Sequence, residues 1–231
     1  MKNTKVAMFF AAGMLVAIPC WAGTVTGKVS FTGTAPAAQP IDMGADPVCS
    51  GQHPDALKSE EVVVNSDNTL KNVFVYIKAG LEGKTFPASA EPAVIDQKGC
   101  HYEPHVLGAM VGQDLQLINS DNTLHNVHAM PEKSKPFNLG MPITGMKLKK
   151  KFDAEEVMVK VKCDVHPWMN AYVGVLTHPF YSVTGDNGTF EIKDLPAGTY
   201  TIEAWHEKYG VQSQQITVTD APSMADFSFA G

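Results

Sequence analysis

The chain has 231 residues, of which 44% are hydrophobic and 18% are charged, and this balance excludes an extended disordered protein. All 18 basic residues are lysines, and with 24 acidic residues the formal net charge is −6. Without arginine the chain lacks the bidentate side chain that best reads phosphates and guanine, so nucleic acid is not an expected partner.

The first 22 residues have the pattern of a secretory signal peptide. Lys2 and Lys5 precede an apolar run over residues 6–19, and small residues surround a cleavage point after Ala22. The run is shorter than the ~18 residues needed to span a bilayer, so we expect no stable membrane insertion after cleavage. The sequence therefore predicts a periplasmic or secreted protein.

Cysteine usage fits an exported protein. Cleavage removes Cys20 and leaves Cys49, Cys100 and Cys163 in an oxidising compartment. Two of them can pair, and the third needs another role.

The remaining chain predicts an all-β protein. Helical periodicity is nearly absent, whereas period-2 alternation recurs in short segments bounded by Gly, Pro, Asn and Asp. The expected strands cover residues 24–31, 62–64, 73–77, 111–118, 125–130, 157–163, 171–176, 190–192, 200–205 and 215–218.

One segment of the sequence occurs twice. Residues 65–73 match residues 119–127 at eight of nine positions, and the exception is Lys71 opposite His125. Duplicated domains would explain the match, but the similarity stops at this segment, which favours a reused polar turn before a strand.

The most specific chemistry lies in one short loop. Cys163, His166 and Met169 follow one another at three-residue intervals and offer a thiolate, an imidazole and a thioether. These are soft ligands suited to copper. Strand parity places Cys163 on the face of Val161 and Met169 on the face of Ala171, so both are expected to point inward. A buried cysteine beside a histidine is often only core, but export removes the cytosolic reason for a free thiol.

A second imidazole is expected from His125, which shares a strand face with Val127. His128 has the opposite parity and is predicted to lie outside the ligand set. Asn126 and Pro167 are expected beside the ligands, with the Asn126 amide tying the two ligand segments together.

A disulfide follows by elimination from this assignment. A ligating Cys163 must be a thiolate, which leaves Cys49 and Cys100 to pair with each other.

These motifs resemble those of the cupredoxins, and most closely the amicyanin-like type 1 copper proteins. The resemblance covers roughly residues 95–178 and rests on the loop Cys-x-x-His-Pro-aromatic-Met at residues 163–169 and on His-Asn-Val-His at residues 125–128. It implies a Greek-key β-sandwich or barrel and one copper ion cycling between Cu(II) and Cu(I). The implied ligands are His125, Cys163, His166 and, axially, Met169.

The flanks resemble a carboxypeptidase regulatory-like, transthyretin-like β-sandwich. The resemblance rests on residues 183–202, on an opening strand at residues 23–29 and on a second strand at residues 72–77. The expected organisation is a signal peptide (1–22), a first part of the regulatory-like sandwich (23–80), an inserted cupredoxin (81–178) and a second part of the sandwich (179–231). A simple tandem is the alternative.

Three further histidines leave a second metal site open. His53, His101 and His105 match no standard zinc spacing, so surface or hydrogen-bonded roles are favoured. Motifs for covalent haem, for a serine hydrolase and for a zinc protease are absent from the sequence.

The sequence thus predicts an exported one-electron carrier, not an enzyme, whose partner is a redox protein such as a c-type cytochrome or a dehydrogenase. The alternative is a copper chaperone or storage protein, suggested by Met130, Met141 and Met146. The electron is expected to leave through an exposed edge of His166. Trp168 would border a docking face there, unless it packs inward.

Overall fold

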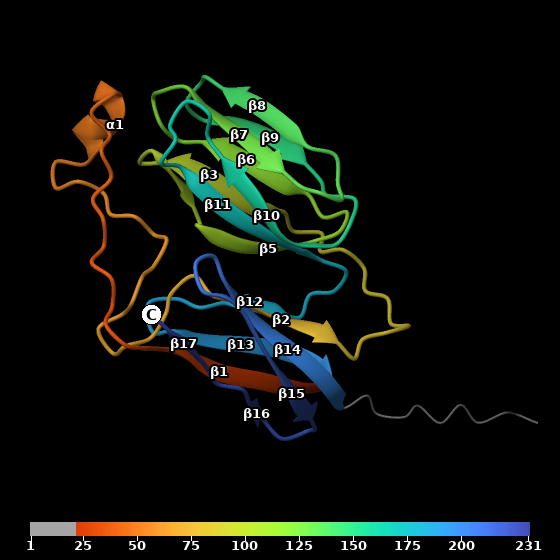
Figure 1. Cartoon of the computed structure of the whole chain (residues 1–231). Coiled ribbons are helices and arrows are strands. Elements are labelled where there is room, and N and C mark those ends of the chain that lie inside the picture. Colours follow the sequence, from red (N-terminus) through yellow and green to blue (C-terminus); the bar gives the residue numbers. More distant parts are fainter. Residues whose placement is uncertain (1–21) are drawn as a thin grey trace, which may run out of the picture.

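The fold is all-β, as the sequence predicts. A computed structural model describes residues 22–231 and contains seventeen strands in four sheets together with one six-residue helix (Figure 1). The predicted signal peptide lies outside the described residues except for Ala22. Within residues 22–231, no helix is long and apolar enough to cross a membrane.

The first sandwich takes its strands from both ends of the described chain. One sheet has the order β13-β1-β16, with β17 also paired to β1, and the other has the order β12-β2-β14-β15. Alternating apolar residues such as Val29, Ile77 and Ile202 fill the space between these sheets. The strands are β1 (Ala22–Thr32), β2 (Phe74–Ala79), β12 (Tyr181–Val183), β13 (Thr189–Pro196), β14 (Gly198–His206), β15 (Gly210–Val218), β16 (Ser223–Met224) and β17 (Phe227–Ala230).

The second sandwich is built from the middle of the chain. Its sheets have the orders β5-β11-β10-β7-β8 and β4-β3-β6-β9. Its separate core includes Leu117, Val127 and Val161, each pointing inward from an alternating strand. The strands are β3 (Ala93–Lys98), β4 (His101–Glu103), β5 (Val106–Met110), β6 (Leu115–Asn119), β7 (His125–Met130), β8 (Phe137–Met141), β9 (Met146–Lys150), β10 (Glu156–Lys162) and β11 (Asn170–Leu176).

The predicted strands are found with two differences. The expected strand over residues 111–118 begins later than expected: residues 111–114 form a turn in which Gly112 has a φ of +78°, and β6 begins only at Leu115. Residues 62–64 form no strand, and only an isolated bridge joins Val64 to Leu70.

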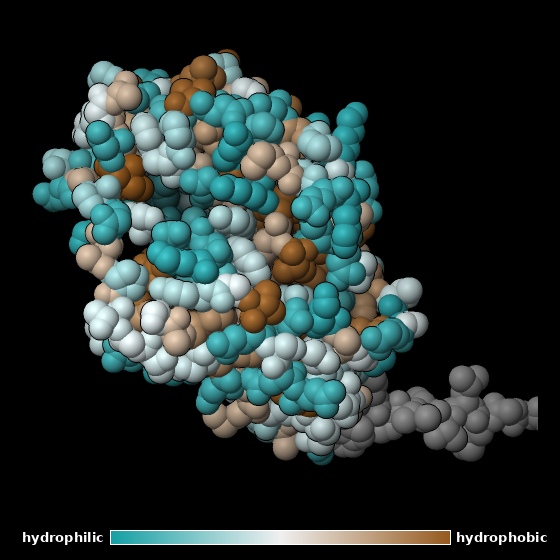
Figure 2. Space-filling model, in the orientation of Figure 1, coloured by the Kyte–Doolittle hydropathy of each residue, from teal (hydrophilic) through white to brown (hydrophobic). Residues whose placement is uncertain are grey.

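Aromatic side chains pack the two sandwiches against each other. Phe74 and Tyr181 of the first sandwich stack with ring centroids 5.4 Å apart, beside Val106 and Leu176 of the second. The face shown in Figure 2 is largely hydrophilic, with small separate hydrophobic groups over both sandwiches. The stacked pair Phe74 and Tyr181 thus lies between the two sandwiches.

A long excursion between β1 and β2 connects the first sandwich to one end of the second. We call residues 33–60 the arm; it carries helix α1 (Pro47–Gln52) and holds it beside the second sandwich (Figure 1). Asp46 caps the helix, since its Oδ1 accepts from the backbone N–H groups of Val48 and Cys49. A disulfide joins Cys49 of the arm to Cys100 between β3 and β4.

Candidate metal centre

The Cys163 loop joins the adjacent strands β10 and β11 and is closed by its own backbone. The N–H of Cys163 donates to the carbonyl of Met169 at 3.1 Å, and the N–H of Met169 donates to the carbonyl of His166 at 3.0 Å. The N–H of His166 points at the Cys163 Sγ at 3.4 Å. This tight turn keeps all three side chains buried at the end of the second core.

His125 begins β7, which pairs with β10, and meets the loop from the neighbouring strand. Its Nδ1 lies 2.9 Å from the Nδ1 of His166, and the Cys163 Sγ lies 3.8 Å from the latter atom. The three donor atoms all lie within 4.8 Å of one another. The structure therefore brings the predicted histidines and cysteine together from positions far apart in the chain.

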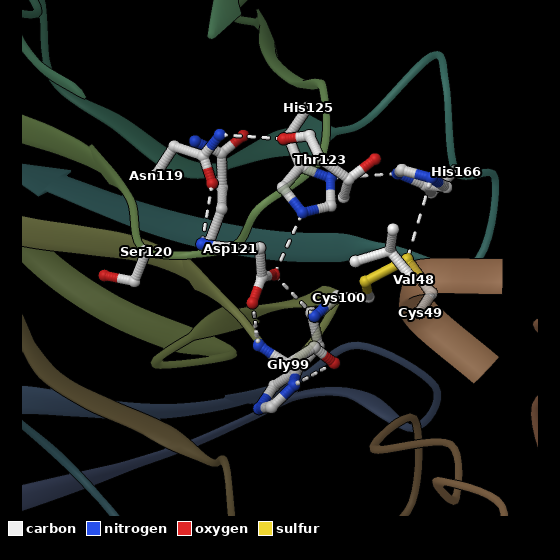
Figure 3. A network of polar contacts seen from close by, with 12 residues as sticks. Val48, Cys49, Gly99, Cys100, Asn119, Ser120, Asp121, Thr123, His125 and His166 are labelled. Carbon is white, nitrogen blue, oxygen red and sulfur yellow. Dashed lines mark hydrogen bonds and ion pairs between the residues drawn. A yellow bond between two sulfur atoms is a disulfide. The ribbon is translucent and has the colours of Figure 1, made fainter. Parts of the chain in front are cut away.

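Each imidazole is held by a carboxylate on its far side. The Nε2 of His125 lies 2.9 Å from Asp121 Oδ2 (Figure 3). The Nε2 of His166 lies 3.0 Å from Asp46 Oδ2. A carboxylate accepts the Nε2 hydrogen, so the Nδ1 lone pair of each ring is directed at the other ring. Two such lone pairs at this separation require a proton or a cation between them.

The electrostatics of the centre also favour a bound cation. Burial opposes a charge on His125, but Asp121 and Cys163 raise the pKa of His125 to about 9. Burial would raise the pKa of Cys163, but hydrogen bonds, first from His125, hold it below its usual value. Burial is likewise outweighed at Asp46, where hydrogen bonds, first from His166, lower the pKa to about 2. A readily formed thiolate and two imidazoles, each backed by a carboxylate at its Nε2, thus face one position.

Asn126 links the two ligand segments. Its Oδ1 accepts from the backbone N–H of Asp164 at 2.7 Å and lies 3.3 Å from the Cys163 Sγ. Its Nδ2 donates to Asn138 at 2.7 Å. The buried amide therefore fixes the cysteine against the strand that carries His125.

The predicted fourth ligand, Met169, and the predicted neighbour Pro167 differ in exposure. Met169 is fully buried in the second core, next to the loop closure. Pro167 is exposed between His166 and Trp168. His125, Cys163 and His166 supply two imidazoles and a thiolate, which suit a soft first-row metal ion, and Met169 adds a thioether to the same region.

The prediction that His166 has an exposed edge is wrong. The residue is only 2% exposed, because Asp46 meets its Nε2 and Cys49 Sγ lies 3.8 Å from the same atom. Trp168 is half-buried, and its indole N–H donates to the carbonyl of Cys100 at 3.0 Å.

The other histidines do not join this centre. His128 lies on the outer side of β7, where its Nδ1 contacts the Asp164 carboxylate. His53 and His101 both reach the carbonyl of Gly99, and His105 pairs with Glu207. Among the described residues, none of these four belongs to a group of three donors close enough to share an ion.

Two site residues were missed from the sequence. Asp121 lies four positions before His125 inside the repeated segment, where its counterpart Asp67 pairs instead with Lys28. The repeat could have drawn attention to this aspartate. Asp46 has the local pattern of a helix N-cap followed by proline, but nothing nearby in the sequence indicates its contact with His166.

Comparisons with known proteins extend only to fold. No family model and no curated protein matches the sequence. A purple cupredoxin from Nitrosopumilus maritimus matches with 26% identity over 36% of this chain and 98% of its own, at a TM-score of 0.31. An oxidised variant of amicyanin matches with 21% identity over 44% of this chain and 97% of its own, at a TM-score of 0.33.

An enzyme is also among the similar structures. A copper-containing nitrite reductase from Thermus scotoductus matches with 18% identity over 65% of this chain and 28% of its own, at a TM-score of 0.35. This neighbour contradicts the sequence-based prediction that the chain is not an enzyme. The structural neighbours are thus cupredoxin proteins that include both amicyanin and a reductase.

Proposed function

We propose that the protein is an exported type 1 copper protein that transfers single electrons. The observation that carries this proposal is the pair of Nδ1 atoms of His125 and His166, 2.9 Å apart and accompanied by the buried Cys163 thiol. These three residues, together with Met169, would hold the ion. When bound, copper supplies one-electron chemistry between Cu(II) and Cu(I).

The protein's own residues keep the ligand set fixed. Asp121 and Asp46 orient the two imidazoles, and Asn126 holds the cysteine loop. Asp121 and Asn126 are buried, Asp46 is partly buried, and all three are hydrogen-bonded. The ligands therefore need not rearrange when an electron arrives or leaves. Such a rigid centre suits electron transfer better than release of metal.

The storage alternative has less support. Of the three methionines behind it, Met141 is fully buried and its Sδ lies 3.0 Å from Gln97 Nε2. Met146 packs partly buried against the second core, and Met130 is half-buried on β7. These thioethers do not form an exposed cluster that could collect additional Cu(I).

Domain organisation and partner complete the proposal. We propose that residues 81–178 are a cupredoxin inserted between residues 23–80 and 179–231, which together form the regulatory-like sandwich. That sandwich provides the base from which the arm reaches the second sandwich (Figure 1).

The electron donor and acceptor are redox proteins such as a c-type cytochrome or a dehydrogenase in the periplasm or outside the cell. The predicted signal peptide supports that location.

Copper titration of the purified protein tests the proposal. We expect one Cu(II) per chain and an intense visible absorption band from the thiolate, which Cys163→Ser removes and His128→Ala retains. His125→Ala should weaken the band, and added imidazole should restore it. Binding without a thiolate band, or rapid loss of Cu(I) to a competing chelator, would instead identify a metal-handling protein.

A further inference from the structure

We propose that Asp46 is a positioning residue of the metal centre, which fixes the His166 imidazole and favours the oxidised over the reduced copper ion. This inference rests on the proposed copper function. It adds to that function a residue of the arm, a segment 120 positions away from His166 in the sequence.

Asp46 is held firmly in its contact with His166. Its Oδ2 accepts from His166 Nε2 at 3.0 Å and from the Thr123 hydroxyl at 3.1 Å. Its Oδ1 accepts from the backbone N–H groups of Val48 at 2.7 Å and Cys49 at 3.1 Å. Both carboxylate oxygens of Asp46 therefore have hydrogen-bond partners. The side chain cannot rotate away from His166 without breaking the N-cap of α1.

The arm is secured three residues after Asp46. Cys49 is bonded covalently to Cys100, and the Cys100 carbonyl accepts from the Trp168 indole. In Figure 3, the disulfide between Cys49 and Cys100 lies below His166, and Thr123 lies between His125 and His166. Asp46 thus reaches the metal centre through a fixed structure rather than through a loose loop.

The other imidazole, that of His125, is held by a carboxylate in the same way. Asp121 contacts His125 Nε2 and is itself held by the N–H groups of Gly99 and Cys100, each at 2.8 Å. Both nitrogen ligands are therefore backed by an anionic acceptor. A carboxylate that accepts the second N–H of a ligating histidine raises its basicity and stabilises the more highly charged metal ion.

The test compares Asp46→Asn with Asp55→Asn in the full copper-loaded chain. Asparagine is as good a helix cap as aspartate, so α1 is expected to persist in the first variant. The variant removes the charge, and because its one carbonyl oxygen serves the cap, its NH2 group faces His166 Nε2 in place of the acceptor. Asp55 is an exposed residue of the arm, and its variant removes the same charge away from the imidazole. The measurements are the affinities for Cu(II) and Cu(I), and the reduction potential.

We expect Asp46→Asn to weaken Cu(II) binding by roughly 10–100-fold and Cu(I) binding much less. Each tenfold decrease in the ratio of the Cu(II) affinity to the Cu(I) affinity raises the reduction potential by about 59 mV for one electron. Asp55→Asn should leave the ratio unchanged. Equal potentials in the two variants and the wild type would overturn the inference while leaving the copper function intact.

A second readout does not depend on copper. In the metal-free protein, the Nε2 hydrogen of His166 should exchange slowly with solvent by nitrogen-15 NMR, and Asp46→Asn should make it exchange faster. Asp46→Ser, which keeps a helix cap but cannot reach the ring in the same way, should behave alike. An unchanged exchange rate in both variants would overturn the positioning role. A wild type without a thiolate band would refute the copper function itself.

Discussion

The indole N–H of Trp168 donates to the carbonyl oxygen of Cys100 across 3.0 Å, and this bond ties the ligand loop to the half-cystine that anchors the arm. The centroids of the Trp168 and His166 rings also lie 4.9 Å apart. The covering of His166 therefore depends on a chain of contacts that begins at the disulfide.

Removing this disulfide should loosen the arm. The bridge closes a loop with a sequence separation of 51 residues, for which chain entropy predicts a stabilisation of about 4 kcal/mol. We expect the Cys49→Ser, Cys100→Ser double variant to lose much of that free energy of unfolding, measured by urea denaturation of the metal-free protein.

Limited proteolysis should locate the effect of the missing disulfide. Cleavage within residues 33–60 should accelerate in the double variant and stay slow in Cys163→Ser, which removes a thiol but keeps the bridge. Equal cleavage of the arm in both proteins would show that noncovalent contacts alone hold it in place.

Asn126 should matter both to stability and to the spectrum. Asn126→Ala removes the acceptor for the Asp164 N–H and the contact with the Cys163 Sγ, so we expect a loss of about 1–3 kcal/mol and a shifted thiolate band. Asn122→Ala is the control, since Asn122 is exposed and its Oδ1 lies 3.4 Å from the Thr144 hydroxyl, far from the cysteine loop in the hydrogen-bond network. A band unchanged in Asn126→Ala would contradict the proposed support of the cysteine.

The strands and ligands that could be predicted from the sequence are those determined by residues close together in the chain. The bounds predicted for β7 agree with the structure, because its apolar residues alternate clearly. By contrast, β9 was missed, since its lysines alternate with residues that are only partly covered. The donor set was predictable because its residue types are rare in combination. The contact of Asp46 with His166 was not, because it depends on where the arm docks.

The buried ion pair between His105 and Glu207 joins the two sandwiches and should make their stability depend on pH. Burial opposes the charge, but Glu207, with a smaller contribution from Glu60, raises the pKa of His105 above its ordinary value. A raised folded pKa contributes stability that is full below the unfolded value of ~6.5 and is lost as pH rises through the folded value.

Glu207→Gln provides the test of this pair. The loss of unfolding free energy relative to the wild type should be larger at about pH 6 than at about pH 9, because only a charged His105 gains from the carboxylate. The exposed pair Lys193 and Glu191 offers a control, and Glu191→Gln should change stability little at either pH. A difference that grows toward high pH would contradict the assignment.

The last prediction concerns the packing between the sandwiches, where Gly108 of β5 faces Tyr181 of β12. A Cβ added at Gly108 would lie 2.1 Å from the Tyr181 ring, whereas one added at Gly140 of β8 would meet no atom within 4 Å. Gly108→Ala should therefore destabilise the protein by about 1–3 kcal/mol through overpacking.

Gly140→Ala should be neutral or slightly stabilising, because it only restricts the unfolded chain. Thermal unfolding of both variants, and of Gly108→Ala combined with Tyr181→Leu, measures the effect. Since the smaller leucine vacates the space that the ring occupies, the double variant should be more stable than the sum of its single changes predicts. Strict additivity would mean that the ring does not limit how closely β5 and β12 approach.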